Sequence, residues 1–72
     1  MDSESKMRIT VNGEESPFPA GISVAELLSI LNVPNVGVAV AVNFEVVRRQ
    51  ALETTRIQDG DRVEIIRAVQ GG

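Results

Sequence analysis

The sequence contains one clear signal for an α-helix, and the segments on both sides of it are patterned as β-strands. This arrangement restricts the folds that the chain can adopt. Ser23-Val24-Ala25-Glu26 is a capping box, in which the serine hydroxyl and the glutamate carboxylate satisfy free backbone N–H groups at a helix start. Apolar residues then recur at helical spacing, at Val24, Leu27, Leu28 and Leu31. A helix this short is stable only when it is packed. The fold must therefore cover this apolar stripe with strands.

The segment before the helix is patterned as a β-hairpin. Residues 7–11 alternate between apolar and polar side chains, as a strand with one buried face does. Asn12-Gly13 then gives the strongest short-range hairpin signal, because a type I′ turn needs positive φ at both central residues. A return strand is expected over residues 14–18. Pro17 cannot donate to a β-ladder, so this strand should lie at a sheet edge.

The segment after the helix is patterned as a strand with two unlike faces. The helix should end at Val33-Pro34, because the residue before a proline is driven out of the helical region. Over residues 36–43, valines alternate with Gly37, Ala39 and Ala41, so one face is broad and the other is shallow. The valine face should pack under the helix. Residues 45–48 are patterned as the antiparallel partner of this strand.

The last third of the chain contains a crossing segment and a final strand. Residues 49–58 have no sustained period, and we expect one helical turn near residues 50–53, with Leu52 and Ile57 as the anchors to the core. Asp59-Gly60-Asp61 is a turn in which glycine supplies the positive φ. It should start a strand over about residues 62–69.

A small apolar patch is predicted on the shallow side of the sheet. Ile66 and Ala68, in the last strand, alternate with the core residues and so should lie on this side of the sheet. They would lie beside Ala39 and Ala41 if the last strand is a neighbour of the strand over residues 36–43. We interpret this patch as a candidate docking face for a partner protein. Its members are Ala39, Ala41, Ile66 and Ala68.

The order strand, strand, helix, strand, strand, strand is that of the β-grasp fold. We expect an α+β, ubiquitin-like architecture, with a mixed four- to five-stranded sheet and one main helix packed across one face. The helix should be a right-handed crossover from the first hairpin to a parallel neighbour. The domain should span residues 7–68, between a flexible N-terminal extension (1–6) and a flexible C-terminal tail (69–72) that ends in Gly-Gly.

Composition excludes several classes of function. The 72 residues include no Cys and no His, which leaves neither a disulfide framework nor a zinc site of the usual ligands. The net charge is −3, and two Phe with seven scattered basic residues do not make a nucleic-acid-binding surface. The longest apolar run, residues 36–42, is far shorter than the roughly 20 residues of a membrane span. Because residues 1–6 contain no hydrophobic signal segment, we expect a cytoplasmic protein. We also expect the protein to be monomeric when no partner is bound.

The C-terminal carboxylate is the one group in the sequence for which we expect a chemical role. Serines have no His to activate them, the carboxylates fall in predicted turns or on solvent faces, and the glycines are too dispersed for a phosphate-binding loop. In Val69-Gln70-Gly71-Gly72, by contrast, two residues without Cβ leave the terminal carboxylate sterically open. A carboxylate presented in this way can be a substrate.

The chain resembles the ThiS family of sulfur-carrier proteins of thiamine biosynthesis, within the wider ThiS/MoaD ubiquitin-like group, over nearly all of residues 7–72. Many members of the family have Gly where Phe44 stands, Pro where Arg48 stands, and an aromatic residue near Leu52. Because Phe is costly at positive φ, we expect a different turn at that hairpin. The segments that carry the resemblance are Asn12-Gly13-Glu14, Ser23-Val24-Ala25-Glu26-Leu27-Leu28, Val38-Ala39-Val40-Ala41-Val42-Asn43, Val47-Arg48-Arg49, Gln58-Asp59-Gly60-Asp61-Arg62-Val63-Glu64-Ile65 and Gly71-Gly72.

The resemblance implies that Gly72 is acted upon by other proteins. A ThiF-like adenylating enzyme would use ATP to convert its carboxylate into an acyl-adenylate. A cysteine desulfurase or other persulfide donor would supply the sulfur of a C-terminal thiocarboxylate, which a thiazole synthase (ThiG-like) would take into the thiazole ring. Gly71 would allow close approach, and Val69 and Gln70 would offer extended backbone to the partner. The chain itself would bind no cofactor and no metal.

Three alternatives to this function are open, and two of them would use the same activated C-terminus. A related carrier could serve another acceptor, in molybdopterin, cysteine or tRNA-thiolation pathways. A ubiquitin-like modifier would use the same activated C-terminus to form an isopeptide bond with a lysine. A plain β-grasp binding module would need no activated end, and the free Gly-Gly argues against it.

Overall fold

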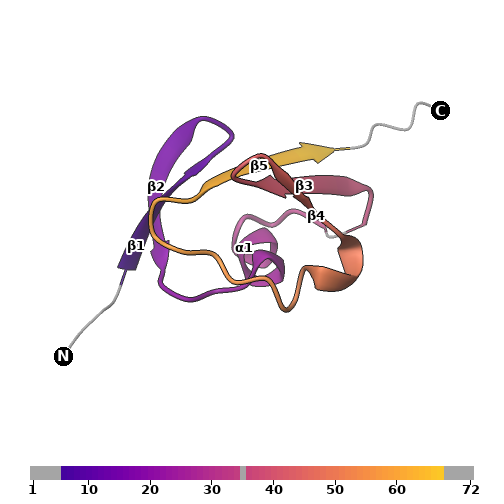
Figure 1. The fold of residues 1–72 in the computed structure, drawn as a ribbon, viewed down its shortest axis with the longest axis horizontal. Helices are drawn as coiled ribbons and strands as arrows, with labels where there is room; N and C mark the ends of the chain where they lie inside the picture. The colour runs from indigo at the N-terminus through magenta and orange to yellow at the C-terminus, as the bar shows by residue number, and fades with distance from the viewer. Residues whose placement is uncertain (1–5, 35, 68–72) are drawn as a thin grey trace.

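In the part of the chain that the structure describes, residues 6–34 and 36–67, five strands and one α-helix form two layers (Figure 1). The structure is a computed structural model. The helix α1 (Val24–Ile30) covers one face of the sheet, and a long connection that includes the 3₁₀ helix η1 (Arg49–Ala51) passes beside it. The strands, in the sheet order β2-β1-β5-β3-β4, are β1 (Lys6–Val11), β2 (Glu14–Pro19), β3 (Val38–Val42), β4 (Glu45–Val47) and β5 (Arg62–Arg67).

The sheet is mixed, and β5 is its middle strand. β1 pairs antiparallel with β2 and parallel with β5, while β3 pairs antiparallel with both β5 and β4. The prediction that the helix joins parallel neighbours is wrong, because α1 links β2 to β3 and two strands lie between them. The parallel pair forms instead between the first and last strands, which no local pattern links.

Two hairpins frame the sheet, and both turn through an asparagine followed by a residue at positive φ. In the first, Asn12 has φ 51° and Gly13 has φ 87°, the type I′ geometry that Asn-Gly predicts. In the second, Asn43 has φ 52° and Phe44 has φ 70°. The expectation of a different turn at Phe44 is therefore wrong. Pro17 lies in β2, at the sheet edge, as predicted.

The helix starts at the predicted capping box. Ser23 Oγ accepts a hydrogen bond from the backbone N–H of Glu26 (3.1 Å), and Glu26 Oε1 accepts one from the backbone N–H of Ser23 (2.8 Å). The N–H of Val24 donates to the Thr55 carbonyl (2.9 Å), so the long connection also holds the helix start. The start of α1 is therefore held both by hydrogen bonds within the helix and by a hydrogen bond from a segment distant in sequence.

The helix ends earlier than predicted, at Ile30 rather than at Val33-Pro34. Asn32 adopts φ 59°, and its N–H donates to the Ser29 carbonyl (3.1 Å). The N–H of Val33 donates to the Leu28 carbonyl (2.8 Å), which completes a Schellman motif. An asparagine in the left-handed conformation thus terminates the helix before the proline can act.

The core lies between α1, the long connection and the covered face of the sheet. Leu52 and Ile57, the predicted anchors of the connection, are both buried, and the N–H of Ile57 donates to the Ile22 carbonyl (2.9 Å). Burying a side chain of this size contributes about 1.5–3 kcal/mol. The buried apolar side chains are those of Met7, Ile9, Phe18, Val24, Leu27, Leu28, Val40, Leu52, Ile57 and Val63.

The boundaries of two strands differ from the predicted ones. Val36, predicted on the valine face, lies before β3 and is exposed, because Gly37 at φ 78° turns the chain ahead of the strand. β1 begins at Lys6, which is paired with Pro19, although residue 6 was predicted to lie in the extension. The remaining boundaries of the predicted domain lie outside the described residues.

Candidate functional site

The predicted site residues fall into two groups, and the structure describes one of them. β5 ends at Arg67, so the structure fixes the strand that leads toward the chain end but not the tail itself. The roles of the tail residues stay predictions. Outside the described residues lie Ala68, Val69, Gln70, Gly71 and Gly72.

Ala39, Ala41 and Ile66 come together on the face of the sheet opposite α1. Ala39 and Ile66 are direct partners in the antiparallel pairing of β3 with β5. Ala39 is exposed, Ala41 is half-buried, and Ile66 is 61% exposed. The neighbouring Val40 and Ile65 belong to the core side, as the alternation of a strand requires. The two strands are neighbours, which is the condition on which the predicted patch depends.

Val46 extends this patch, and sequence reasoning missed it. It is paired with Ala41 across β3 and β4, and it is 72% exposed. The adjacent Val47 is paired with Val40 and packs against the core. Two consecutive valines cannot reveal which one faces solvent until the register is known, because a slip of one residue exchanges them. We call Ala39, Ala41, Val46 and Ile66 the open-face patch.

Phe44 and Arg62 border the open-face patch at the start of β5, and sequence reasoning did not pair them. Phe44 is 75% exposed. The guanidinium carbon of Arg62 lies 5.3 Å from the centroid of its ring, which is a cation–π contact. Arg62 has the same strand parity as Ile66, so both project from the open face. A large aromatic surface with a cation beside it therefore stands next to the patch.

The charge on the open face differs in sign from that of the chain. Strand parity places three cations and two carboxylates on this face, a local balance of +1, whereas the described residues 6–34 and 36–67 together have seven basic and eight acidic side chains, a balance of −1. The other described residues therefore balance to −2. The open-face charged residues of the described strands are Lys6, Arg8, Arg62, Glu15 and Glu64.

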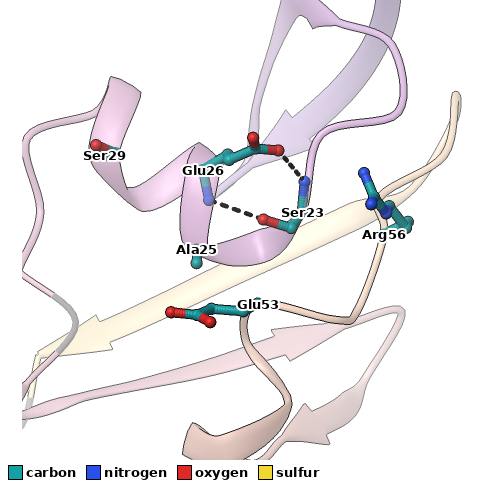
Figure 2. Close-up of a pocket in the computed structure, with 6 residues that line it drawn as sticks. All are labelled: Ser23, Ala25, Glu26, Ser29, Glu53 and Arg56. Atoms are coloured by element: carbon teal, nitrogen blue, oxygen red, sulfur yellow. Dashed lines mark hydrogen bonds between the residues drawn. The ribbon is translucent and has the colours of Figure 1, made fainter.

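A shallow polar pocket of about 360 Å³ beside the start of α1 offers no acid–base pair for catalysis (Figure 2). The side chains of Ser23 and Glu26 are occupied in the capping box. Arg56 donates to the Gly21 carbonyl (2.8 Å), and Figure 2 shows it directed away from Glu53. Within residues 6–34 and 36–67, no three His, Cys, Asp or Glu side chains gather as a metal site requires. No helix in these residues has the length and apolarity to cross a membrane.

Comparisons with known proteins agree along nearly the whole chain. The model of the ThiS family matches residues 5–72. The sulfur carrier protein ThiS of Escherichia coli is 33% identical over 66 residues, which cover 92% of this chain and 100% of that protein. A thiazole synthase of Paramagnetospirillum magneticum is 38% identical over 66 residues, again 92% of this chain, but the chain spans only 20% of that protein's length.

Solved structures give the same result for the fold. The crystal structure of the thiamine biosynthesis protein ThiS from Geobacter metallireducens has a TM-score of 0.80 and 40% identity, over 92% of this chain and 100% of that one. The solution structure of a thiamine biosynthesis protein from the same organism has a TM-score of 0.76 and 40% identity, over 92% and 88% of the two chains. The prediction of an α+β β-grasp fold is confirmed.

Proposed function

The chain belongs to the ThiS family and is therefore a sulfur carrier of thiamine biosynthesis rather than a catalyst, and we propose that Gly72 is the residue that carries the sulfur. The observation that carries this proposal is the match to the ThiS family model, which extends through Gly71 and Gly72. The chain lacks both Cys and His, two residue types that commonly act as nucleophile or general base.

Loading requires activation, because a carboxylate is a poor electrophile. A ThiF-like enzyme transfers the AMP portion of ATP to the Gly72 carboxylate and releases pyrophosphate. The terminal sulfur of a persulfide, formed by a cysteine desulfurase or another donor, then attacks the acyl carbon and AMP leaves. Thiol cleavage of the resulting acyl disulfide leaves the thiocarboxylate on Gly72. We place these steps in the cytoplasm, where ATP is available.

The tail residues make this chemistry accessible. Gly71 and Gly72 lack a Cβ, so they can pass through a slot too narrow for a side chain. Val69 and Gln70 supply extended backbone that a partner can pair with as an added strand. Because β5 leads directly toward these residues, a partner that grips the tail also lies against the end of the sheet.

Thiazole synthase is the acceptor that we propose for the sulfur. The relative from Paramagnetospirillum magneticum is a thiazole synthase in which a segment similar to this chain makes up 20% of the length. Two proteins joined in one polypeptide work at high effective concentration, as expected for a donor and its acceptor. Transfer of the sulfur to the acceptor, with one oxygen atom taken up at the acyl carbon in exchange, would regenerate the Gly72 carboxylate.

The open-face patch supplies recognition of the body in this proposal. Its support is the 61% and 72% exposure of Ile66 and Val46 beside two small alanines, in a domain whose other face is covered by α1. Replacing Ala41 and Ile66 together by Glu should weaken docking to the adenylating enzyme at least about tenfold, because buried carboxylates lose solvation in an apolar contact. Titration calorimetry measures the dissociation constant, and Ile30→Glu, on α1, is the control. Unchanged sulfur loading in the double variant would show that the patch assignment is wrong.

Intact-mass measurement tests the carrier chemistry. The full chain is incubated with a ThiF-like enzyme, ATP and a persulfide donor, beside a variant that lacks Gly72. Exchange of one oxygen for sulfur adds about 16 Da, and the gain should be confined to the full-length form. A ladder of heavier conjugates would indicate the modifier alternative. No mass change with any cognate enzyme would contradict the proposal.

A further inference from the structure

We propose that Phe44 and Arg62 form an anchor that selects this carrier at the adenylation step, by entering an apolar pocket with a carboxylate at its rim on the adenylating enzyme. The inference rests on the proposed function, because it assigns a recognition element to the enzyme that activates Gly72. It adds two residues that lie outside both the tail and the predicted docking patch.

The first observation is backbone strain combined with exposure. Phe44 holds φ 70°, a conformation that favours glycine, and its ring is nevertheless 75% exposed. An exposed ring gains little from burial, so the ring's own packing does not account for the strain. Residues in sparsely populated conformations collect at ligand clamps, where the surrounding structure holds them in place. Here Asn43 supplies that support, through its hydrogen bonds to Asp61 (3.0 Å) and to the Arg62 N–H (2.9 Å).

The second observation is the chemistry of the pair. The guanidinium of Arg62 lies 5.3 Å from the ring centroid and leaves both groups at the surface. Arginine is among the residues that most often dominate binding energy at protein interfaces, and phenylalanine is enriched there relative to the rest of the surface. A ring needs an apolar pocket, and a guanidinium matches the two oxygens of a carboxylate. The pair therefore defines the complementary surface, which suits an open face whose strand charges sum to +1.

The third observation is position. Arg62 begins β5 and Arg67 ends it, so the anchor and the root of the tail are separated by five residue steps, roughly 17 Å. The open-face patch lies between them, with Ala39 paired to Ile66. A partner that holds both ends of β5 fixes the direction in which the chain end is presented. Such two-point attachment positions a reacting carboxylate better than a tail alone can.

The adenylating enzyme is the occupant that needs this anchor most. It acts on an unmodified carboxylate, a group that every protein chain has at its C-terminus, so selection must come from the tail sequence and from the body of the carrier. A sulfur acceptor, by contrast, can recognise the thiocarboxylate itself. A second copy of this chain fits less well, because a symmetric contact centred on the pair would bring Arg62 against Arg62.

Replacement of Phe44 by glycine separates a recognition role from a structural one. Phe44→Gly removes the ring and relieves the strain, because glycine adopts positive φ freely. We expect the KM for the carrier in ATP–pyrophosphate exchange to rise about tenfold with kcat unchanged. The ring would contribute the same binding energy to the enzyme–carrier complex and to the transition state, so its loss should not change kcat. The thermal unfolding midpoint should be no lower than that of the wild type. Ile30→Ala, a change of an exposed apolar residue on α1, is the control and should leave KM unchanged.

Arg62→Gln tests the charge. Rim charges act mainly on association rate and its salt dependence. The variant should associate more slowly with the adenylating enzyme and show a weaker dependence of the rate on ionic strength, when stopped-flow rates are compared at low and high salt. A rate and a salt dependence equal to those of the wild type would overturn the assignment of Arg62.

The remaining outcomes are distinguishable. Equal KM values for wild type and Phe44→Gly overturn the anchor while leaving the proposed function intact, and so does weakened binding to thiazole synthase alone. A lower unfolding midpoint with unchanged KM shows that Phe44 serves the fold. A wild-type dimer that Phe44→Gly dissociates also overturns the proposal, in favour of a second copy as the occupant. Failure of the enzyme to adenylate the wild type contradicts the proposed function and the anchor together.

Discussion

The two hairpin turns of the sheet have the same backbone geometry but different second residues. Asn12-Gly13 has φ values of 51° and 87°, and Asn43-Phe44 has 52° and 70°. Glycine adopts this conformation freely, whereas an L-residue with a side chain does so at a cost of roughly 1–2 kcal/mol. The first turn has the residue that stability alone would select. The second has a phenylalanine with an exposed ring in a backbone conformation that is unfavourable for it, which indicates a role other than stabilising the fold.

The asparagines of the two turns show how that strain is tolerated. Both bond to β5, one from each side of the strand. Asn12 Oδ1 accepts from the N–H of Ile65 (2.8 Å), while Asn43 Oδ1 accepts from the N–H of Arg62 (2.9 Å). Asn43 makes one further side-chain bond, from Nδ2 to Asp61 Oδ1 (3.0 Å). The strained turn is thus the one whose asparagine makes more side-chain hydrogen bonds, one to β5 and one to the turn before it.

Removal of the asparagine side chain should lower the free energy of unfolding more at Asn43, in the second turn, than at Asn12, in the first. Asn43→Gly keeps the positive φ but deletes two side-chain hydrogen bonds, so we expect the free energy of unfolding to fall by about 2 kcal/mol. Asn12→Gly deletes one and should cost about 1 kcal/mol. Urea denaturation of both variants measures the difference. Equal losses would contradict the view that Asn43 holds the strained turn.

Insertion of a ring into the first turn should reproduce the strain of the second. A Cβ at Gly13 would meet no heavy atom within 4 Å, so Gly13→Phe adds backbone strain without a clash. We expect the free energy of unfolding to fall by roughly 1–2 kcal/mol. If urea denaturation finds no loss, positive φ is not the cost that separates the two turns.

Relief of the strain in the second turn should have the smallest effect and the opposite sign. In Phe44→Gly, the relief is offset by the greater freedom of glycine in the unfolded chain and by loss of the contact with Arg62. We expect a gain of no more than about 1 kcal/mol in the free energy of unfolding. A loss of stability by the same denaturation assay would mean that the ring contributes more to the fold than its exposure implies.

The same two turns show what the sequence could and could not predict. Asn-Gly encodes its turn locally, so the first hairpin and the edge position of Pro17 follow from residues that are close in the chain. The turn at Phe44 contradicts its local preference, because bonds from Asn43 to residues 18 and 19 positions later decide it. Local propensity has no access to such contacts.

The candidate site divides in a similar way. Ala39, Ala41 and Ile66 were predictable from strand alternation once β3 and β5 are neighbours. Val46 was not, because its orientation depends on the β3–β4 register. The early end of the helix at Ile30, ahead of the left-handed Asn32, and the parallel pairing of β1 with β5 also depend on geometry that the sequence pattern does not specify. The roles of Val69, Gln70, Gly71 and Gly72 rest on family membership and stay predictions.

The central claim is that this chain delivers sulfur from Gly72, and transfer of an isotopic label tests it most directly. The full chain is loaded with heavy sulfur by the adenylating enzyme and a labelled persulfide donor, separated from both, and mixed with thiazole synthase and its remaining substrates. The account predicts that the label appears in the thiazole product and that the carrier returns to its unmodified mass. An unlabelled thiazole, or label that stays on the carrier while product forms, would contradict it.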